Sequence, residues 1–291
     1  MRRIPWLNIV LFVVTFLTTL VVGTFHAMNI SFDSFAGFVG FLKGLAADPL
    51  KLVTGLPFSV SLMVILLSHE AAHYIASKKH RVVATLPYFI PAPSVFGTLG
   101  AFIRMKSPIT TKNALMDIGA SGPIAGFVMS VLACAVGLSL SRVMPVVQVT
   151  DGFMFGPSLL FYGMARLILG NIPPDYGVSM NPIAFAGWIG FFVTSLNLIP
   201  VGQLDGGHIA YALLGERHAK ISKILIGVLF VMGIVLYEGW LIWAVLLIVL
   251  GFRHPPIVYS DIPLDRRRRI VGWIALAIFI ATFTPVPVMV S

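Results

Sequence analysis

Two histidines and a glutamate are spaced so that they could bind a metal ion and activate water. The segment His69-Glu70-Ala71-Ala72-His73 has the pattern H-E-x-x-H. In a helix, residues i and i+4 share a face, so His69 and His73 can both bind one zinc ion. Glu70 could then act as a general base. This spacing is typical of metalloproteases, although a bare H-E-x-x-H also occurs by chance in soluble proteins.

The surroundings of this motif favour function over chance. The mostly apolar run from Pro57 to Ser68 precedes it, and Tyr74-Ile75-Ala76 follows. Insertion of a charged residue into the middle of a membrane costs about 2.5–3.5 kcal/mol on insertion scales. Three ionisable groups would be expensive there unless a metal or polar partners compensate them. We therefore interpret H-E-x-x-H as a zinc site inside a membrane span.

The composition is that of a membrane protein. The 291 residues are 58% hydrophobic and 11% charged, with a mean hydropathy of +0.95, whereas soluble domains have about a quarter charged residues. The net charge of +9 and the run Arg266–Arg269 suit basic residues that flank spans better than nucleic-acid binding. The single Cys134 excludes an intramolecular disulfide and a cysteine-rich zinc site.

We expect an all-α polytopic membrane protein with about six to seven transmembrane helices. The first apolar run is about twenty residues, longer than the 7–15 of a signal peptide, so we interpret it as a retained span. Two further apolar segments, 34–47 and 156–170, are expected to lie at the membrane interface. The expected spans are 5–27, 57–77, 114–141, 181–199, 220–237, 239–252 and 270–289.

Basic residues predict the orientation. With a cytoplasmic N-terminus and alternating spans, sixteen of the 20 Lys and Arg residues fall on the cytoplasmic side. The span that carries H-E-x-x-H then leaves the membrane at Lys78-Lys79. Glu70 precedes Lys78 by eight residues, or about 12 Å along a helix. The site is thus expected inside the membrane but nearer the cytoplasmic face.

A catalytic zinc ion needs a third protein ligand, for which Asp117, Asp205, His208 and Glu238 are candidates. Glu238 falls in an outer turn, and Asp117 could cap a helix or pair with a nearby lysine. Asp205 follows the span 181–199, in a segment where Pro200 and Gly202 break the helix. Broken helices at membrane depth occur where they line a cavity, so Asp205 is favoured. A helix-capping Asp205 remains the alternative, and His208 could orient a ligand.

The segment 82–106 begins and ends on the cytoplasmic side, so it should be re-entrant. Val82–Thr85 and Leu99–Ile103 have strand composition, and prolines and glycine separate them. The prediction is a small β-hairpin or loop. An interfacial loop with only a packing role is the alternative.

Together, these motifs resemble the site-2 protease family of intramembrane zinc metalloproteases (peptidase family M50). The resemblance covers roughly residues 57–215. The motifs Phe96–Lys106 and Asp117–Gly126 are similar to those of the branch that includes compact prokaryotic members and chloroplast relatives. Nothing in the chain resembles a PDZ insert. The motifs that carry it are His69-Glu70-Ala71-Ala72-His73, Asn197-Leu198-Ile199-Pro200-Val201-Gly202-Gln203-Leu204-Asp205-Gly206, Phe96–Lys106 and Asp117–Gly126.

The resemblance implies that His69, His73 and Asp205 bind one Zn²⁺ and that Glu70 is the general base. It implies that Asn197 holds the substrate backbone or the developing oxyanion; the alternative is that Asn197 only packs helices. The re-entrant segment would lie near the active site, where an extended substrate could add as a strand. Gly119, Gly122 and Gly126 are interpreted as helix-packing residues.

The expected function is hydrolysis of transmembrane protein substrates, in regulated intramembrane proteolysis or in the clearance of signal-peptide remnants. The alternatives are a metal transporter or sensor, and a catalytically silent relative that binds membrane helices. The expected location is a prokaryotic cell membrane, with the lipid bilayer and no nucleic acid as partner. We divide the chain into a first helix with an outer segment (1–56), a catalytic core (57–215) and C-terminal helices (216–291).

Overall fold

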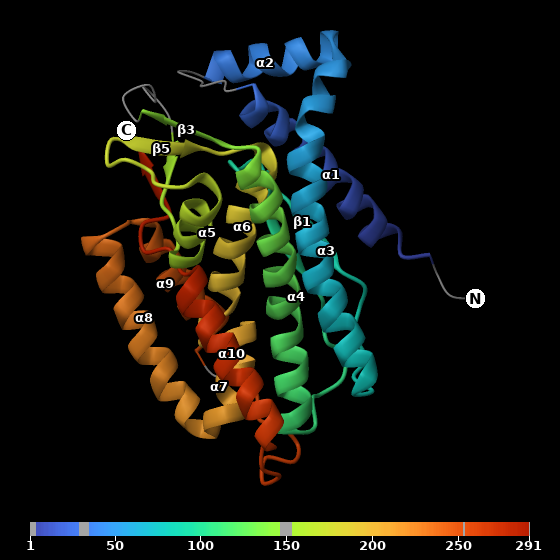
Figure 1. Cartoon of the computed structure of the whole chain (residues 1–291). Helices are drawn as coiled ribbons and strands as arrows, with labels where there is room; N and C mark the ends of the chain where they lie inside the picture. Colours follow the sequence, from blue (N-terminus) through green and yellow to red (C-terminus); the bar gives the residue numbers. More distant parts are fainter. Residues whose placement is uncertain (1–3, 29–34, 146–152, 253, 291) are drawn as a thin grey trace.

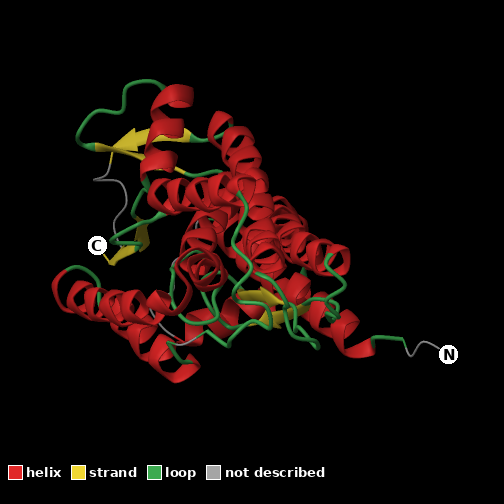
Figure 2. Ribbon diagram, turned by 90° about the horizontal axis from the view of Figure 1, so that it is seen from below, coloured by secondary structure: helices red, strands yellow, loops and turns green. Residues whose placement is uncertain are grey.

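The computed structural model describes residues 4–28, 35–145, 153–252 and 254–290. Within them the fold is a bundle of helices with three two-stranded sheets (Figures 1 and 2). The helices are α1 (Trp6–Ala27), α2 (Phe35–Ala47), η1 (Pro49–Gly55), α3 (Leu56–Lys79), α4 (Lys112–Ser139), α5 (Leu159–Leu169), α6 (Pro182–Asn197), α7 (Asp205–Leu214), η3 (Gly215–Arg217), α8 (His218–Val235), α9 (Gly239–Leu250) and α10 (Arg266–Thr282).

The prediction of a polytopic helical membrane protein is confirmed. In the described part of the chain, four helical segments are long and apolar enough to cross a membrane: Trp6–Ala27, Pro49–Lys79, Lys112–Ser139 and Asp205–Val235. Helices α6 and α9 are apolar but shorter. The seven spans expected from sequence correspond to α1, α3, α4, α6, α8, α9 and α10. The first six agree with these helices to within about two residues at each end. The last span was expected at 270–289, but α10 ends at Thr282 and Val288–Val290 forms a strand.

Helices α3, α4 and α6 form the centre of the bundle. Capping residues mark where α4 and α6 begin. Helix α4 begins after Thr111, whose hydroxyl accepts a hydrogen bond from the Ala114 amide (3.1 Å). Helix α6 begins after Asn181, whose side chain accepts from the Ile183 amide (3.0 Å). Such caps satisfy amides that the first helical turn leaves free. Together, α3, α4 and α6 bury a core that includes Phe58, Leu62, Cys134, Trp188 and Phe191.

The two segments expected at the interface differ from one another. Helix α2 lies across the end of the bundle where α1 ends and α3 begins (Figure 1). Helix α5 packs instead against α4 and α10. With 11 residues, α5 is about 16 Å long, which is too short to cross a membrane.

A re-entrant hairpin connects α3 to α4, as predicted, but its first strand lies later than expected. Strand β1 (Tyr88–Pro91) pairs antiparallel with β2 (Thr98–Phe102). Val82–Thr85 is not a regular strand and forms only an isolated bridge between Ala84 and Met105. Pro91 falls within β1, next to a register irregularity, where the missing proline N–H costs no ladder bond.

Two further small sheets were not predicted. They pair β3 (Arg142–Pro145) with β5 (Tyr176–Ser179) and β4 (Phe153–Phe155) with β6 (Val288–Val290). Their partners are far apart in sequence, so local composition gives no signal for them.

Helix α1 holds the hairpin in place. The Asn8 side-chain amide donates to the carbonyl of Pro87 (2.8 Å), and the Thr18 hydroxyl donates to the carbonyl of Gly97 (2.7 Å). The Thr19 hydroxyl also lies 2.7 Å from that of Ser59 on α3. The segment interpreted as a retained span is therefore packed against both the hairpin and the helix that carries H-E-x-x-H.

Candidate metal centre

Helix α3 places both histidines of H-E-x-x-H on one face. His69 and His73 are each 5% exposed, and their Nε2 atoms lie 3.0 Å apart. The two imidazole rings meet edge to face, with centroids 4.8 Å apart. The i, i+4 spacing thus converges two nitrogen donors on one point, as the sequence predicts.

Asp205 joins the two histidines from another helix. It is the first residue of α7, after the irregular segment 198–204. Its Oδ2 lies 3.1 Å from His69 Nε2 and 3.2 Å from His73 Nε2. Across the described residues, this is the one cluster of three or more His, Cys, Asp or Glu side chains that could hold a metal ion. Two imidazoles and a carboxylate are a donor set that suits zinc.

The two histidine rings have room between α3 and α4 because α4 has glycines where it faces them. A Cβ atom on Gly122 would overlap the His73 ring, and one on Gly126 would lie 3.1 Å from His69 Nδ1. The sequence interpretation of these glycines as helix-packing residues missed that they make room for the two imidazoles. Spacing alone could not show which side chain they face.

The backbone of α4 also orients His73. The Ile118 carbonyl oxygen lies 2.7 Å from His73 Nδ1. A carbonyl can only accept, so Nδ1 carries the proton and Nε2 keeps its lone pair in the neutral ring. Hydrogen bonds of this kind hold metal-binding histidines in the required tautomer. No side-chain pattern in the sequence indicates this contact.

Glu70 lies beside the histidines with one carboxylate oxygen unpaired. The residue is 4% exposed, and its Oε2 is buried without a hydrogen-bond partner in the described structure. The Ile103 backbone, just after β2, hydrogen-bonds the same carboxylate. Burying a polar atom without a hydrogen-bond partner costs free energy. The unpaired Oε2 therefore indicates that this oxygen faces a bound group, such as water or a metal ion. The cluster and the orphan oxygen together fit a zinc site.

Asn197 is the last residue of α6 and is half-buried. Its chain neighbour Leu198 packs directly against Gly206, the residue after Asp205. Among the described residues no hydrogen bond involves the Asn197 side-chain amide, so the contact expected of a helix-packing asparagine is missing. Its amide remains free to bind a ligand.

The other third-ligand candidates lie elsewhere. Asp117 pairs with Arg268 Nη2 (2.6 Å) and with His80 Nε2 (2.7 Å), not with Lys112. Glu238 precedes α9, at the end of α8 away from α7 (Figure 1). The Asp117 network joins the ends of α3, α4 and α10, and sequence could not pair residues 151 positions apart.

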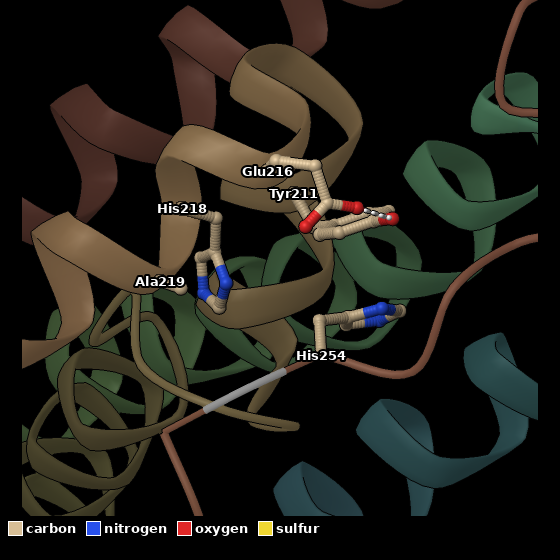
Figure 3. A pocket seen from close by; sticks show the side chains of 5 residues that line it. All are labelled: Tyr211, Glu216, His218, Ala219 and His254. Carbon is tan, nitrogen blue, oxygen red and sulfur yellow. Dashed lines mark hydrogen bonds between the residues drawn. The ribbon is translucent and has the colours of Figure 1, made fainter.

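His208 does not contact the ligand histidines through any hydrogen bond in the described structure. Its Nδ1 lies 2.7 Å from Nε2 of His254, and the His254 ring stacks on Tyr211. His254 and Tyr211 line a pocket of about 290 Å³ with Glu216 and His218 (Figure 3). Burial lowers the pKa of His254 to about 4, against a favourable hydrogen bond to the Pro255 carbonyl. In the described structure, His208 therefore makes no hydrogen bond through which it would orient a metal ligand.

The fold and this cluster define an integral membrane protein with a buried two-histidine, one-carboxylate centre. Residues 57–237 match the family model described as Peptidase family M50. This match covers more than half of the chain, and the chain therefore belongs to peptidase family M50, the family that its motifs resemble.

The related proteins are named as chloroplastic proteases. The chain is 34% identical over 163 residues to "Probable zinc metalloprotease EGY2, chloroplastic" of Oryza sativa subsp. indica, covering 55% of the chain and 30% of that protein. It is 36% identical over 167 residues to the EGY1 counterpart of Arabidopsis thaliana, covering 56% and 30%. The match thus spans about a third of the length of these relatives. No solved structure matches the chain.

Proposed function

We propose that this protein is an intramembrane zinc endopeptidase that cleaves peptide bonds within or next to transmembrane segments. The observation that carries the proposal is the convergence of His69, His73 and Asp205 beside the unpaired, buried Glu70 Oε2. The likeness to proteins named as zinc metalloproteases supports the same reaction.

His69, His73 and Asp205 would hold the metal ion. When bound, zinc supplies a Lewis acid that lowers the pKa of water toward about 7 and polarises a carbonyl group. Glu70 would accept a proton from the attacking water and deliver it to the leaving amine. The Asn197 amide would donate a hydrogen bond to the substrate carbonyl as negative charge develops.

The substrate would bind in extended form at the free edge of β2. The sheet has two strands, so each has one outer edge without a strand partner. Helix α1 packs along β1, and we therefore place the substrate at the edge of β2. Ile103 follows β2 directly and reaches Glu70, which links that edge to the proposed base. A helix hides its peptide bonds in its own hydrogen bonds, so a transmembrane substrate must unwind before it pairs with a strand.

We further propose that the end of the bundle where α3 ends and α4 and α10 begin faces the cytoplasm. This end, called the basic face below, carries Lys78, Lys79, Lys112 and the run Arg266–Arg269. Positive residues favour the cytoplasmic side. The N-terminus and the entry of water to the site would then be cytoplasmic, in the cell membrane of a prokaryote. Its work would be regulated intramembrane proteolysis or removal of signal-peptide remnants.

A metal transporter is the alternative from another class. Ion paths need acidic or histidine ligands at several depths, whereas the described residues bring such a set together at one depth. A general-base glutamate also has no evident role in transport. The endopeptidase is therefore favoured.

Glu70→Gln tests the reaction while preserving size and hydrogen bonding. Wild type and variant would be reconstituted in liposomes with a membrane-protein substrate, and zinc per chain would be measured in the same samples. We expect one zinc ion in both proteins and at least a hundred-fold loss of cleavage in the variant, as for removal of a general base. Glu238→Gln, in the turn before α9, is the matched control and should cleave normally.

Three outcomes would contradict the proposal. Equal cleavage by Glu70→Gln would remove Glu70 from the reaction. Wild-type protein with bound zinc but no cleavage of membrane substrates, combined with tight binding of their helices, would indicate a silent relative. Uptake of zinc into sealed liposomes that contain the protein, at the same rate in wild type and Glu70→Gln, would indicate transport.

A further inference from the structure

A large apolar groove lies between α8 and α10, on the basic-face half of the bundle. Its volume is about 900 Å³, and α7, α8, α10 and the segment that follows α6 line most of it. Helix α8 packs on α9 and α7, while α10 packs on α4, α5, α6 and α7, so a gap separates α8 from α10 (Figure 1). Helix α8 lies in a segment apolar enough to cross a membrane, and α10 is apolar after Arg269. We therefore expect this gap to open toward the bilayer rather than toward water.

One end of the groove is cationic. Lys112, the first residue of α4, and Arg269, in the first turn of α10, both line it. In the part of the chain that the structure describes, neither side chain forms an ion pair. Arg268 differs, because Asp117 and Asp265 bind it. Two cations without an acidic partner beside an apolar groove are complementary to an anionic amphiphile.

The rest of the groove has the depth of one leaflet. From Arg269, the lining continues along α10 through Gly272, Trp273 and Leu276 to Phe279. Ten residues of helix rise about 15 Å, which is half of a hydrocarbon core about 30 Å thick. The cations therefore lie at headgroup level, and the apolar lining extends to about the middle of the bilayer.

The charge of the groove favours a lipid over a transmembrane helix as occupant. An anionic headgroup matches the two cations at one end, whereas an apolar transmembrane helix brings no negative charge to that depth. Pockets of roughly 300–1,000 Å³ hold single small molecules. Acyl chains are narrower than a helix and can follow the groove.

We propose that this groove binds one anionic glycerophospholipid from the leaflet at the basic face. Its phosphate binds at the end formed by Lys112 and Arg269, and an acyl chain lies along Gly272, Trp273 and Leu276. The lipid also contacts Leu198, Pro200 and Gly206, which belong to the segment that leads to and includes the start of α7. The lipid thereby packs against the segment between α6 and α7, which positions Asp205. The lipid site itself does not depend on the proposed proteolysis.

The test uses the full chain, delipidated in a mild detergent. Phosphatidylglycerol and phosphatidylcholine with identical acyl chains would be titrated separately. Native mass spectrometry would count bound lipids, and thermal unfolding would report stabilisation. We expect one tightly bound phosphatidylglycerol and a higher unfolding temperature with phosphatidylglycerol than with phosphatidylcholine.

The double variant Lys112→Gln/Arg269→Gln should bind phosphatidylglycerol about 30-fold more weakly, since each cation near an anionic lipid surface contributes about 1 kcal/mol. The matched control Arg266→Gln/Arg267→Gln removes the same number of charges, both from residues of α10 outside the groove lining, and should bind as wild type. Leu276→Trp, which narrows the apolar part without changing charge, should also weaken binding. Circular dichroism and gel filtration would confirm that each variant is folded.

Several results would overturn the proposal. Equal binding of both lipids would mean that the headgroup is not recognised, and an equal loss in both double variants would indicate diffuse charge attraction. Stabilisation by inorganic phosphate or glycerol phosphate as strong as that by the lipid would indicate an anion site without acyl chains. Displacement of the lipid by a hydrophobic transmembrane peptide of neutral charge would make the groove a helix-binding site.

Discussion

Gly122 on α4 lies so close to His73 on α3 that a Cβ atom would overlap the imidazole ring. The absence of a side chain here lets two helices approach at the point where ligand atoms must converge. The same helix supplies the Ile118 carbonyl that accepts from His73 Nδ1. Helix α4 therefore contributes no metal ligand but decides where one of them lies.

Gly122→Ala should weaken zinc binding without unfolding the bundle. The added methyl group must displace the His73 ring, because the alternative is movement of two packed helices. Changes that disturb ligand orientation commonly lower metal affinity by about 10–100-fold. Competition with a chromophoric chelator would measure this affinity.

Gly227→Ala provides the matched control. Gly227 lies in α8, and a Cβ there would meet nothing within 4 Å. Alanine in a helix interior is favoured over glycine by about 0.5–1 kcal/mol, so this variant should keep its zinc and gain stability. Equal zinc affinity in Gly122→Ala and Gly227→Ala would contradict the proposed fit at His73.

The third-ligand assignment can be tested by comparing two aspartates. Asp205→Asn should lose zinc, because an amide oxygen is a poorer zinc ligand than a carboxylate. Asp117→Asn should keep zinc but lose about 1–3 kcal/mol of stability, since it weakens a partly buried pair with Arg268 and His80. Metal content and thermal unfolding of the two purified variants would decide. Zinc loss in Asp117→Asn alone would reverse the assignment.

The sequence predicts the site because its chemistry is local. His69 and His73 lie one helical turn apart, so their convergence follows from helix geometry. Asp205 could be favoured because Pro200 and Gly202 interrupt the helix before it, and the structure does begin α7 at Asp205. The long apolar runs gave the spans for the same reason, because helix length and hydrophobicity are local properties.

What the sequence did not predict depends on contacts between distant segments. The Ile118 carbonyl and the Ile103 backbone act through main-chain atoms, which residue type does not encode. Strand β1 was placed too early because Val82 and Val83 have higher strand propensity than the proline-flanked Tyr88–Pro91. Pairing with β2 overrode that preference. The contact of His208 with His254 likewise joins residues 46 positions apart.

Asn197→Ala should slow cleavage without removing zinc. If the amide donates to the developing oxyanion, its loss should lower kcat by about 10²–10³-fold and leave KM nearly unchanged. Asn171→Ala is the control, because Asn171 is exposed and bonds only Arg166 in the described structure. A raised KM with normal kcat would instead assign Asn197 to binding of the substrate ground state.

Acidification should destabilise the protein through His254. Its pKa is lowered from 6.5 to about 4 by burial, so between these values the unfolded chain binds more protons than the folded one. Stability from this group is thus complete above pH 6.5 and is lost as the pH falls toward 4. The loss between pH 7 and pH 5 is at most about 2 kcal/mol, and solvent access to the ring reduces it.

His254→Gln isolates this effect. Its side-chain carbonyl can still accept a hydrogen bond from His208 Nδ1, but it cannot be protonated in this range. Unfolding temperatures in detergent at pH 7 and pH 5 would be compared for the two proteins. We expect the wild type to lose more stability on acidification than the variant. Only the wild type has this imidazole, which is protonated in the unfolded chain at pH 5 but stays mostly neutral in the folded protein. The same loss in both proteins would show that other groups govern the acid sensitivity.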